Sequence, residues 1–145
     1  MAHYADTSFL VSLYVRDAFS VPAQTWLTTN RVALPLTEFG RTELRNALTR
    51  LAFTGTLTAP QLAAAWQLVE TDLNQGRLLA CAPAWPAVFA AAERLVAGHT
   101  VQLGTRTLDV VHVASALALG ATDFVSFDSR QAALAQAAGL AWHRP

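Results

Sequence analysis

Four acidic side chains, far apart in the chain, are the residues whose type and surroundings could do chemistry: Asp6, Glu43, Asp109 and Asp128. Asp6 and Asp128 each end a short apolar segment that has the character of a buried strand. If these two strands are parallel neighbours, both carboxylates reach the carboxyl edge of the sheet, where folds of this kind bind ligands. We therefore expect Asp6 and Asp128 to converge.

The other two acids also have simpler interpretations. Asp109 lies one turn into a helix expected to begin near Thr107, where an acid interacts favourably with the helix dipole by about 0.3–1 kcal/mol. Glu43 lies in a helix with an apolar stripe, and an acid beside such a stripe is commonly a solvated flank residue. Glu38 is a rival for this position, but it lies about 140° away around the helix, so both cannot face one metal ion.

Taken together, the four acids suggest metal-assisted chemistry. Two like charges 4 Å apart repel by roughly 4 kcal/mol at an effective dielectric constant of about 20, so a cluster of ionised carboxylates needs cations or protons. Hard oxygen ligands suit Mg²⁺ or Mn²⁺ and do not suit Zn²⁺. Such ions lower the pKa of bound water and stabilise the transition state of phosphodiester hydrolysis.

The elements that must position these acids alternate along the chain. Five short apolar segments are predicted as strands: residues 3–6, 32–35, 78–82, 124–128 and 140–142. Segments with a 3.6-residue period are predicted as helices: residues 9–15, 21–29, 37–53, 60–75, 86–98, 108–119 and 130–138. Thr58 and Thr107 are predicted N-caps, and Gly98 is expected to close a helix with positive φ. The alternation predicts an α/β fold with a central, mostly parallel five-stranded sheet between helical layers.

Composition narrows the class of protein. The chain has 145 residues, 53% hydrophobic and 14% charged, which fits one domain over residues 1–145. All ten basic residues are Arg, which excludes P-loop and Schiff-base chemistry that depends on Lys. A single cysteine, Cys81, leaves no disulfide framework. No charged leader or membrane span is recognised, so a reducing cytoplasmic location is expected.

The sequence around the four acids resembles a PIN domain of the VapC-like toxin type, the ribonuclease half of toxin–antitoxin pairs. The resemblance covers nearly the whole chain and rests on four ordered segments: Tyr4-Ala5-Asp6-Thr7-Ser8, Glu43-Leu44-Arg45-Asn46-Ala47-Leu48, Asp109-Val110-Val111-His112-Val113-Ala114-Ser115-Ala116-Leu117 and Phe124-Val125-Ser126-Phe127-Asp128. Ser126 stands where many relatives carry Thr, and it keeps the hydroxyl.

The resemblance implies a three-layer PIN-like fold and a Mg²⁺- or Mn²⁺-dependent endoribonuclease. Its acids map onto Asp6, Glu43, Asp109 and Asp128, and the hydroxyl of Thr7 or Ser8 would orient a carboxylate or a metal-bound water. It also implies an RNA substrate, a cognate antitoxin protein and a homodimer. The alternatives are a PIN nuclease in RNA processing outside toxin systems and a non-catalytic PIN-fold binding module. A haloacid-dehalogenase-type phosphatase is disfavoured, because Ser8 replaces its second Asp and its Lys is missing.

Other residues have both a functional and a structural interpretation. His112, three residues after Asp109, is either a proton shuttle or, as we favour, a packed structural histidine. Arg106 and Arg130 either hold RNA phosphates or are solvated. Arg41, Arg45 and Arg50 have the same alternatives, with phosphate binding less favoured. The four Trp residues are scattered over different elements, which suggests packing, although Trp can stack on bases. An apolar surface on the second and fourth helical segments could accept an antitoxin helix or a second copy of the chain.

Overall fold

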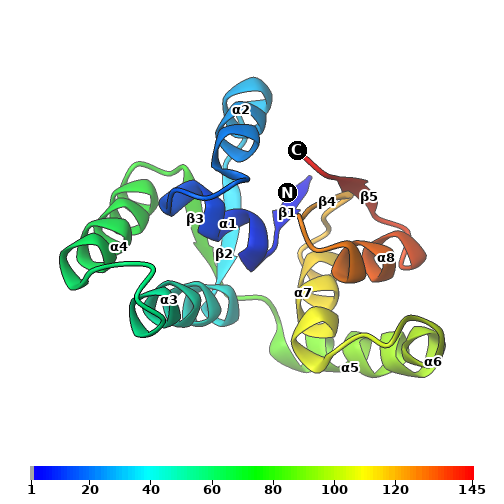
Figure 1. Cartoon of the computed structure of the whole chain (residues 1–145). Helices are drawn as coiled ribbons and strands as arrows, with labels where there is room; N and C mark the ends of the chain where they lie inside the picture. The colour runs from blue at the N-terminus through cyan, green and yellow to red at the C-terminus, as the bar shows by residue number, and fades with distance from the viewer. Residues whose placement is uncertain (1) are drawn as a thin grey trace. The chain divides into compact units, whose positions relative to one another are not determined.

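A computed structural model describes residues 2–145 of the chain. Its contacts divide it into two compact units, each described here by itself. The first comprises the N-terminal segment up to Asp6 together with Ala82–Pro145, and the second is Thr7–Cys81. Figure 1 labels the elements of both.

The first unit contains a parallel three-stranded sheet in the order β1-β4-β5. Its strands are β1 (His3–Ala5), β4 (Asp123–Val125) and β5 (Ala141–His143). Its helical elements are α5 (Trp85–Leu95), the π-helical η1 (Val96–Thr100), α6 (Val101–Leu103), α7 (Thr107–Ala118) and α8 (Ser129–Ala137). Helices α5 and α7 pack side by side (Figure 1). The largest fully buried side chains of this unit include Tyr4, Phe124, His112, Val110 and Leu134.

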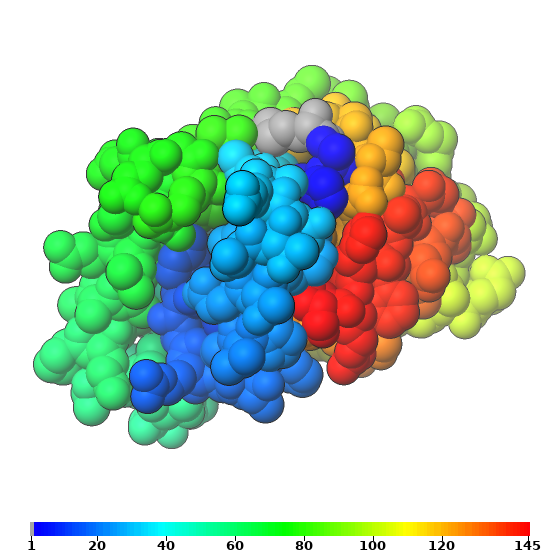
Figure 2. Space-filling model, turned by 90° about the horizontal axis from the view of Figure 1, so that it is seen from above, coloured from blue at the N-terminus to red at the C-terminus, as the bar shows by residue number. Residues whose placement is uncertain are grey.

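The second unit contains a parallel two-stranded sheet formed by β2 (Leu34–Thr37) and β3 (Leu78–Cys81). Its helices are α1 (Thr7–Tyr14), α2 (Ser20–Asn30), α3 (Glu38–Phe53) and α4 (Ala59–Asn74). Within Ser20–Asn30 only Ala23 is buried, and Figure 2 shows this helix in light blue on the surface. The buried core of the unit includes Phe9, Leu10, Leu34, Leu44, Leu48 and Val69.

All five expected strands are present and every pairing is parallel, so the α/β fold class is confirmed. The backbone pairing differs from the expected single sheet, because the strands divide into ladders of three and two. Each strand has only three or four residues. The sequence predicts where such short apolar strands lie, but which strands pair with each other depends on long-range contacts.

The helix boundaries follow local capping chemistry. Thr58 is the N-cap of α4, as expected, and forms a capping box with Gln61. Thr37 caps α3 by accepting a hydrogen bond from the amide of Gly40 at 2.9 Å. The expected helix end at Gly98 is wrong, because the chain continues through η1 and α6 to Gly104. Gly104 has φ 63°, which a residue without Cβ adopts at low cost.

Among residues 2–145, the helices are all too short or too polar to cross a lipid bilayer.

Candidate active site

Asp6 directly follows β1, at the carboxyl end of the first unit's sheet. The register pairs Ala5 with Val125, so the next residues on the two strands, Asp6 and Ser126, are neighbours. Asp6 has no exposed surface, and the Ser126 hydroxyl donates a hydrogen bond to its Oδ2 at 2.6 Å. The expectation that the first and fourth strands lie next to each other is therefore confirmed.

Asp128 does not end a strand as expected. Strand β4 ends at Val125, and Asp128 is instead the N-cap of α8. Its Oδ1 accepts hydrogen bonds from the amides of Arg130 at 2.9 Å and Gln131 at 3.2 Å. The reason is local, because a short acidic side chain satisfies the unpaired amides at a helix start better than it fits a strand.

Ser126 connects these two acids. Besides donating to Asp6, its Oγ accepts a hydrogen bond from the amide of Asp128 at 2.9 Å. The Ser126 side chain is completely buried. Its position therefore fixes the Asp6 carboxylate relative to the turn that carries Asp128.

Asp109 is the third residue of α7 and is only 8% exposed. Its Oδ2 accepts a hydrogen bond from the amide of Arg106 at 3.1 Å, which is the helix-start role considered from the sequence. Its Oδ1 accepts a second hydrogen bond, at 3.0 Å, from the side-chain amide of Gln131. A carboxylate that only caps a helix does not need this burial or this distant partner.

Gln131 therefore contacts two of the predicted acids, although the sequence predicted no role for it. Its backbone amide donates to Asp128 and its side-chain Nε2 donates to Asp109. Its Oε1 is buried and has no hydrogen-bond partner among residues 2–145. A Gln three residues after a capping acid is a recognisable helix-start pattern. No local signal in the sequence indicates that its side chain contacts α7.

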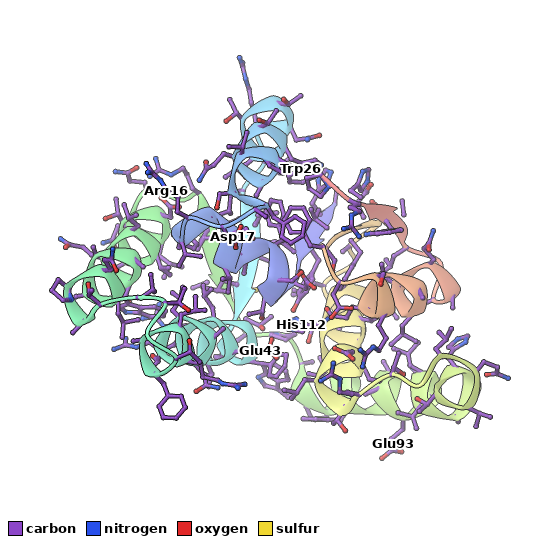
Figure 3. The ribbon with its side chains drawn as sticks, viewed as in Figure 1. Arg16, Asp17, Trp26, Glu43, Glu93 and His112 are labelled. Carbon is purple, nitrogen blue, oxygen red and sulfur yellow. The ribbon has the colours of Figure 1, made fainter. Side chains whose placement is uncertain are left out.

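Glu43 belongs to the second unit, where it is half-buried on α3 (Figure 3). The Thr7 hydroxyl donates a hydrogen bond to its Oε2. Thr7 immediately follows Asp6 in the sequence, so the residue that orients Glu43 is covalently attached to the buried acid of the first unit. Its rival Glu38 is exposed in the first turn of α3.

The donor chemistry of these residues suits a hard divalent cation. The network of Asp6, Asp109 and Asp128 offers carboxylate oxygens and contains no thiol or imidazole. In the described part of the chain, however, no three His, Cys, Asp or Glu side chains stand close enough to grip one ion as they are placed. Ser126 and Gln131 connect the three acids of this network through hydrogen bonds.

Two other titratable residues of the first unit have contacts that fit structural roles. His112 on α7 is 1% exposed, and its Nδ1 lies 2.9 Å from the Tyr4 hydroxyl, which fits the packed histidine that we favoured. Asp123 begins β4, at the opposite end of this strand from Ser126, and contacts His143 at 2.6 Å. Hydrogen bonds from Thr122 and then from His143 lower the pKa of Asp123.

Arg106 and Arg130 flank the network on the surface. Both side chains are exposed, while their backbone amides bond Asp109 and Asp128. Cys81 lies in the second unit, where burial and then the charge of Glu38 raise the pKa of its thiol.

A family model for the PIN domain matches residues 4–137. Among solved structures, the chain is similar to VapC20 of Mycobacterium tuberculosis, a toxin that cleaves the sarcin–ricin loop, with 19% identity, a TM-score of 0.72 and coverage of 99% of this chain and 100% of that one. It is also similar to VapBC-1 of nontypeable Haemophilus influenzae, with 16% identity, a TM-score of 0.60 and coverage of 99% and 97%. FitAcB of Neisseria gonorrhoeae gives 17% identity, a TM-score of 0.63 and the same coverage. No curated protein matches by sequence.

Proposed function

Because the chain belongs to the PIN domain family, we propose that it is a single-domain, Mg²⁺- or Mn²⁺-dependent endoribonuclease that acts as the toxin of a type II toxin–antitoxin pair. The observation that carries this proposal is the connected network in the first unit. There Ser126 joins Asp6 to Asp128, and Gln131 joins Asp128 to Asp109. Three buried or half-buried carboxylates linked by two uncharged side chains are costly to a fold that makes no use of them.

Asp6, Glu43, Asp109 and Asp128 would hold the ion. When bound, Mg²⁺ or Mn²⁺ would supply activation of water and neutralisation of charge at the scissile phosphate. The chain itself orients the carboxylates, with Ser126 acting on Asp6, Gln131 acting on Asp109 and Thr7 acting on Glu43. The buried position of Asp6 keeps bulk water from the carboxylate and strengthens its interaction with a cation.

Cleavage of defined RNAs tests this proposal. A labelled sarcin–ricin loop RNA and unstructured RNAs are incubated with the purified chain in Mn²⁺ or in EDTA, and products are mapped at nucleotide resolution. Cleavage is expected only with Mn²⁺, and Asp6→Asn or Asp109→Asn should remove it. Glu93→Gln, which changes an exposed acid on α5, is the matched control and should cleave normally. Undiminished cleavage by both Asn variants would refute the assignment, and absence of both cleavage and Mn²⁺ binding would favour the non-catalytic binding module.

A cavity in the second unit supports the proposed antitoxin partner. It has a volume of about 610 Å³ and lies among α1, α2 and α4, with Leu13, Leu27 and Leu68 contributing apolar surface. Leu68 is 52% exposed, so an apolar helix from a partner would bury it. Co-expression with the product of a neighbouring short reading frame should give a complex that Leu68→Glu disrupts. Phe53→Glu on α3, which changes another exposed apolar residue, is the control. A DNA-binding partner would separate a toxin from a PIN nuclease of RNA processing.

The proposed homodimer and cytoplasmic location have separate tests. Two exposed apolar side chains of the first unit, Phe89 and Val96, line one apolar depression that a second copy could cover. Sedimentation velocity is expected to give a dimer that Val96→Asp converts to a monomer. A fluorescent fusion is expected to remain in the cytoplasm.

A further inference from the structure

The outer face of α3 carries two arginines stacked on a tryptophan of α4. The guanidinium carbon of Arg45 lies 4.4 Å from the centroid of the Trp66 ring, and that of Arg41 lies 5.0 Å from it. Both distances are within the range of cation–π contacts. Arg41 and Arg45 are four residues apart, so they share one face of the helix. We call Arg41, Arg45 and Trp66 the α3–α4 cluster.

Two depressions adjoin this cluster. One, of about 400 Å³, is lined by Arg41, Arg45, Trp66 and the polar side chains Thr42, Asn46 and Thr49. The other, of about 360 Å³, is lined by Arg45, Thr49, Trp66 and the apolar side chains Ala59, Leu62 and Ala63. A flat ring can therefore enter beside the Arg45–Trp66 stack from either side, with hydroxyl and amide groups on one side to meet polar edges.

The charges of the cluster favour an anionic ligand. Arg41 is paired with Glu70, whereas Arg45 is exposed and forms no ion pair with any residue from 2 to 145. The cluster thus combines at least one uncompensated guanidinium with a stacking platform, which is the combination that binds single-stranded nucleic acid.

We propose that the α3–α4 cluster binds single-stranded RNA, with a base stacked against the Arg45–Trp66 pair and a flanking phosphate held by Arg45. This inference rests on the proposed function, because it assigns a second contact region to the same RNA substrate. Glu43 is two residues from each arginine, about 200° around α3, so it lies on the far side of the helix. The cluster therefore contributes to RNA affinity and takes no part in bond cleavage.

RNA binding by a cleavage-deficient chain tests the proposal directly. In the Asp6→Asn background, fluorescence anisotropy is measured with a labelled single-stranded RNA over a range of salt concentrations. Arg45→Ala is expected to weaken binding about tenfold and to reduce the slope of log affinity against log salt by about 0.7, the value for one phosphate contact to a single strand. Arg45→Lys should keep the slope but lose affinity, because an ammonium group cannot stack as a guanidinium does. Trp66→Leu should weaken binding by about tenfold with an unchanged slope.

Arg94→Ala on α5 removes an exposed arginine outside the cluster and serves as the control, with thermal melting verifying that each variant folds. In the cleaving chain, Arg45→Ala should raise KM and leave kcat unchanged. RNA affinities of the cluster variants within twofold of the control would overturn the proposal. If the cluster variants lose the complex with the antitoxin but keep RNA binding, the cluster is a protein interface, and the proposal is overturned as well. If the unsubstituted chain cleaves no RNA but binds RNA in a way that depends on Arg45, the proposed function fails and this inference stands.

Discussion

Ser126→Ala tests whether the network around Asp6 is as tightly organised as its geometry indicates. The change removes a buried hydroxyl that donates to the Asp6 carboxylate at 2.6 Å and accepts from the Asp128 amide at 2.9 Å. A hydrogen bond to a charged group contributes about 1.5–3 kcal/mol, and a lost amide partner adds about 1 kcal/mol. We therefore expect the free energy of unfolding to fall by about 2.5–4 kcal/mol, a roughly 60- to 700-fold drop in the folding equilibrium constant.

Ser115→Ala is the matched control. Ser115 is as completely buried as Ser126, but its hydroxyl has no hydrogen-bond partner in the part of the chain that the structure describes. Removing an unsatisfied buried hydroxyl should leave stability unchanged or raise it by about 1 kcal/mol. The contrast between the two serines separates the effect of the network from that of deleting an oxygen atom in the core.

Urea unfolding in EDTA at pH 7, followed by circular dichroism, measures both variants. A double-mutant cycle measures the contribution of the Asp6 charge. In the Asp6→Asn background, Ser126→Ala should lower the free energy of unfolding by at least about 1 kcal/mol less than it does in the unsubstituted chain. Equal urea midpoints for Ser126→Ala and Ser115→Ala would refute the reasoning. A full cost of Ser126→Ala in the Asn background would show that the charge of Asp6 contributes nothing to the effect of the serine.

Three further changes probe other parts of the chain. Gln131→Met keeps the length of the side chain but removes the hydrogen-bond donor to Asp109. Calorimetric titration should show that the affinity for Mn²⁺ falls about 10- to 100-fold. Gln136→Met, on the exposed side of α8, is the control and should leave this affinity unchanged. Burial, and then the hydrogen bond to Asp72, raises the pKa of Tyr14, so the folded chain keeps a proton that the unfolded chain loses above about pH 10. Urea midpoints should consequently fall more steeply as the pH rises beyond about 10, and Tyr14→Phe should reduce this steeper fall. Thr58→Ala removes the cap of α4 and should lower the free energy of unfolding by about 1 kcal/mol, as measured by the same urea titration.

Local chemistry made the elements predictable. The expected helices and strands occur in the expected order, because the spacing of apolar residues and the capping residues are signals contained within a few neighbouring residues. The capping box of Thr58 and the position of Asp6 at the end of β1 are of this kind. Where two local signals competed, the boundary moved, since Asp128 follows an apolar segment but its carboxylate bonds the first amides of α8.

Of the candidate site, only the acidic residues could be predicted from the sequence. Their residue type and their resemblance to a PIN domain identified Asp6, Glu43, Asp109 and Asp128, whose catalytic roles stay predictions. Gln131 could not be found in this way, because nothing in its own segment indicates that its side chain extends to α7. Glutamine on a helix is ordinarily exposed, and only the packing of α8 against α7 makes this one buried.

The sequence by itself determined the order of the elements, their class and the acids available for chemistry. Only the tertiary structure decided that the five strands form a three-stranded and a two-stranded sheet. It also decided that Ser126 joins Asp6 to Asp128 and that Gln131 connects α8 to Asp109. These contacts join residues 120 and 22 positions apart. Neighbouring residues constrain a helix or a cap directly, whereas contacts at such separations form only when the packing of the whole core outweighs the entropy of closing the chain between them.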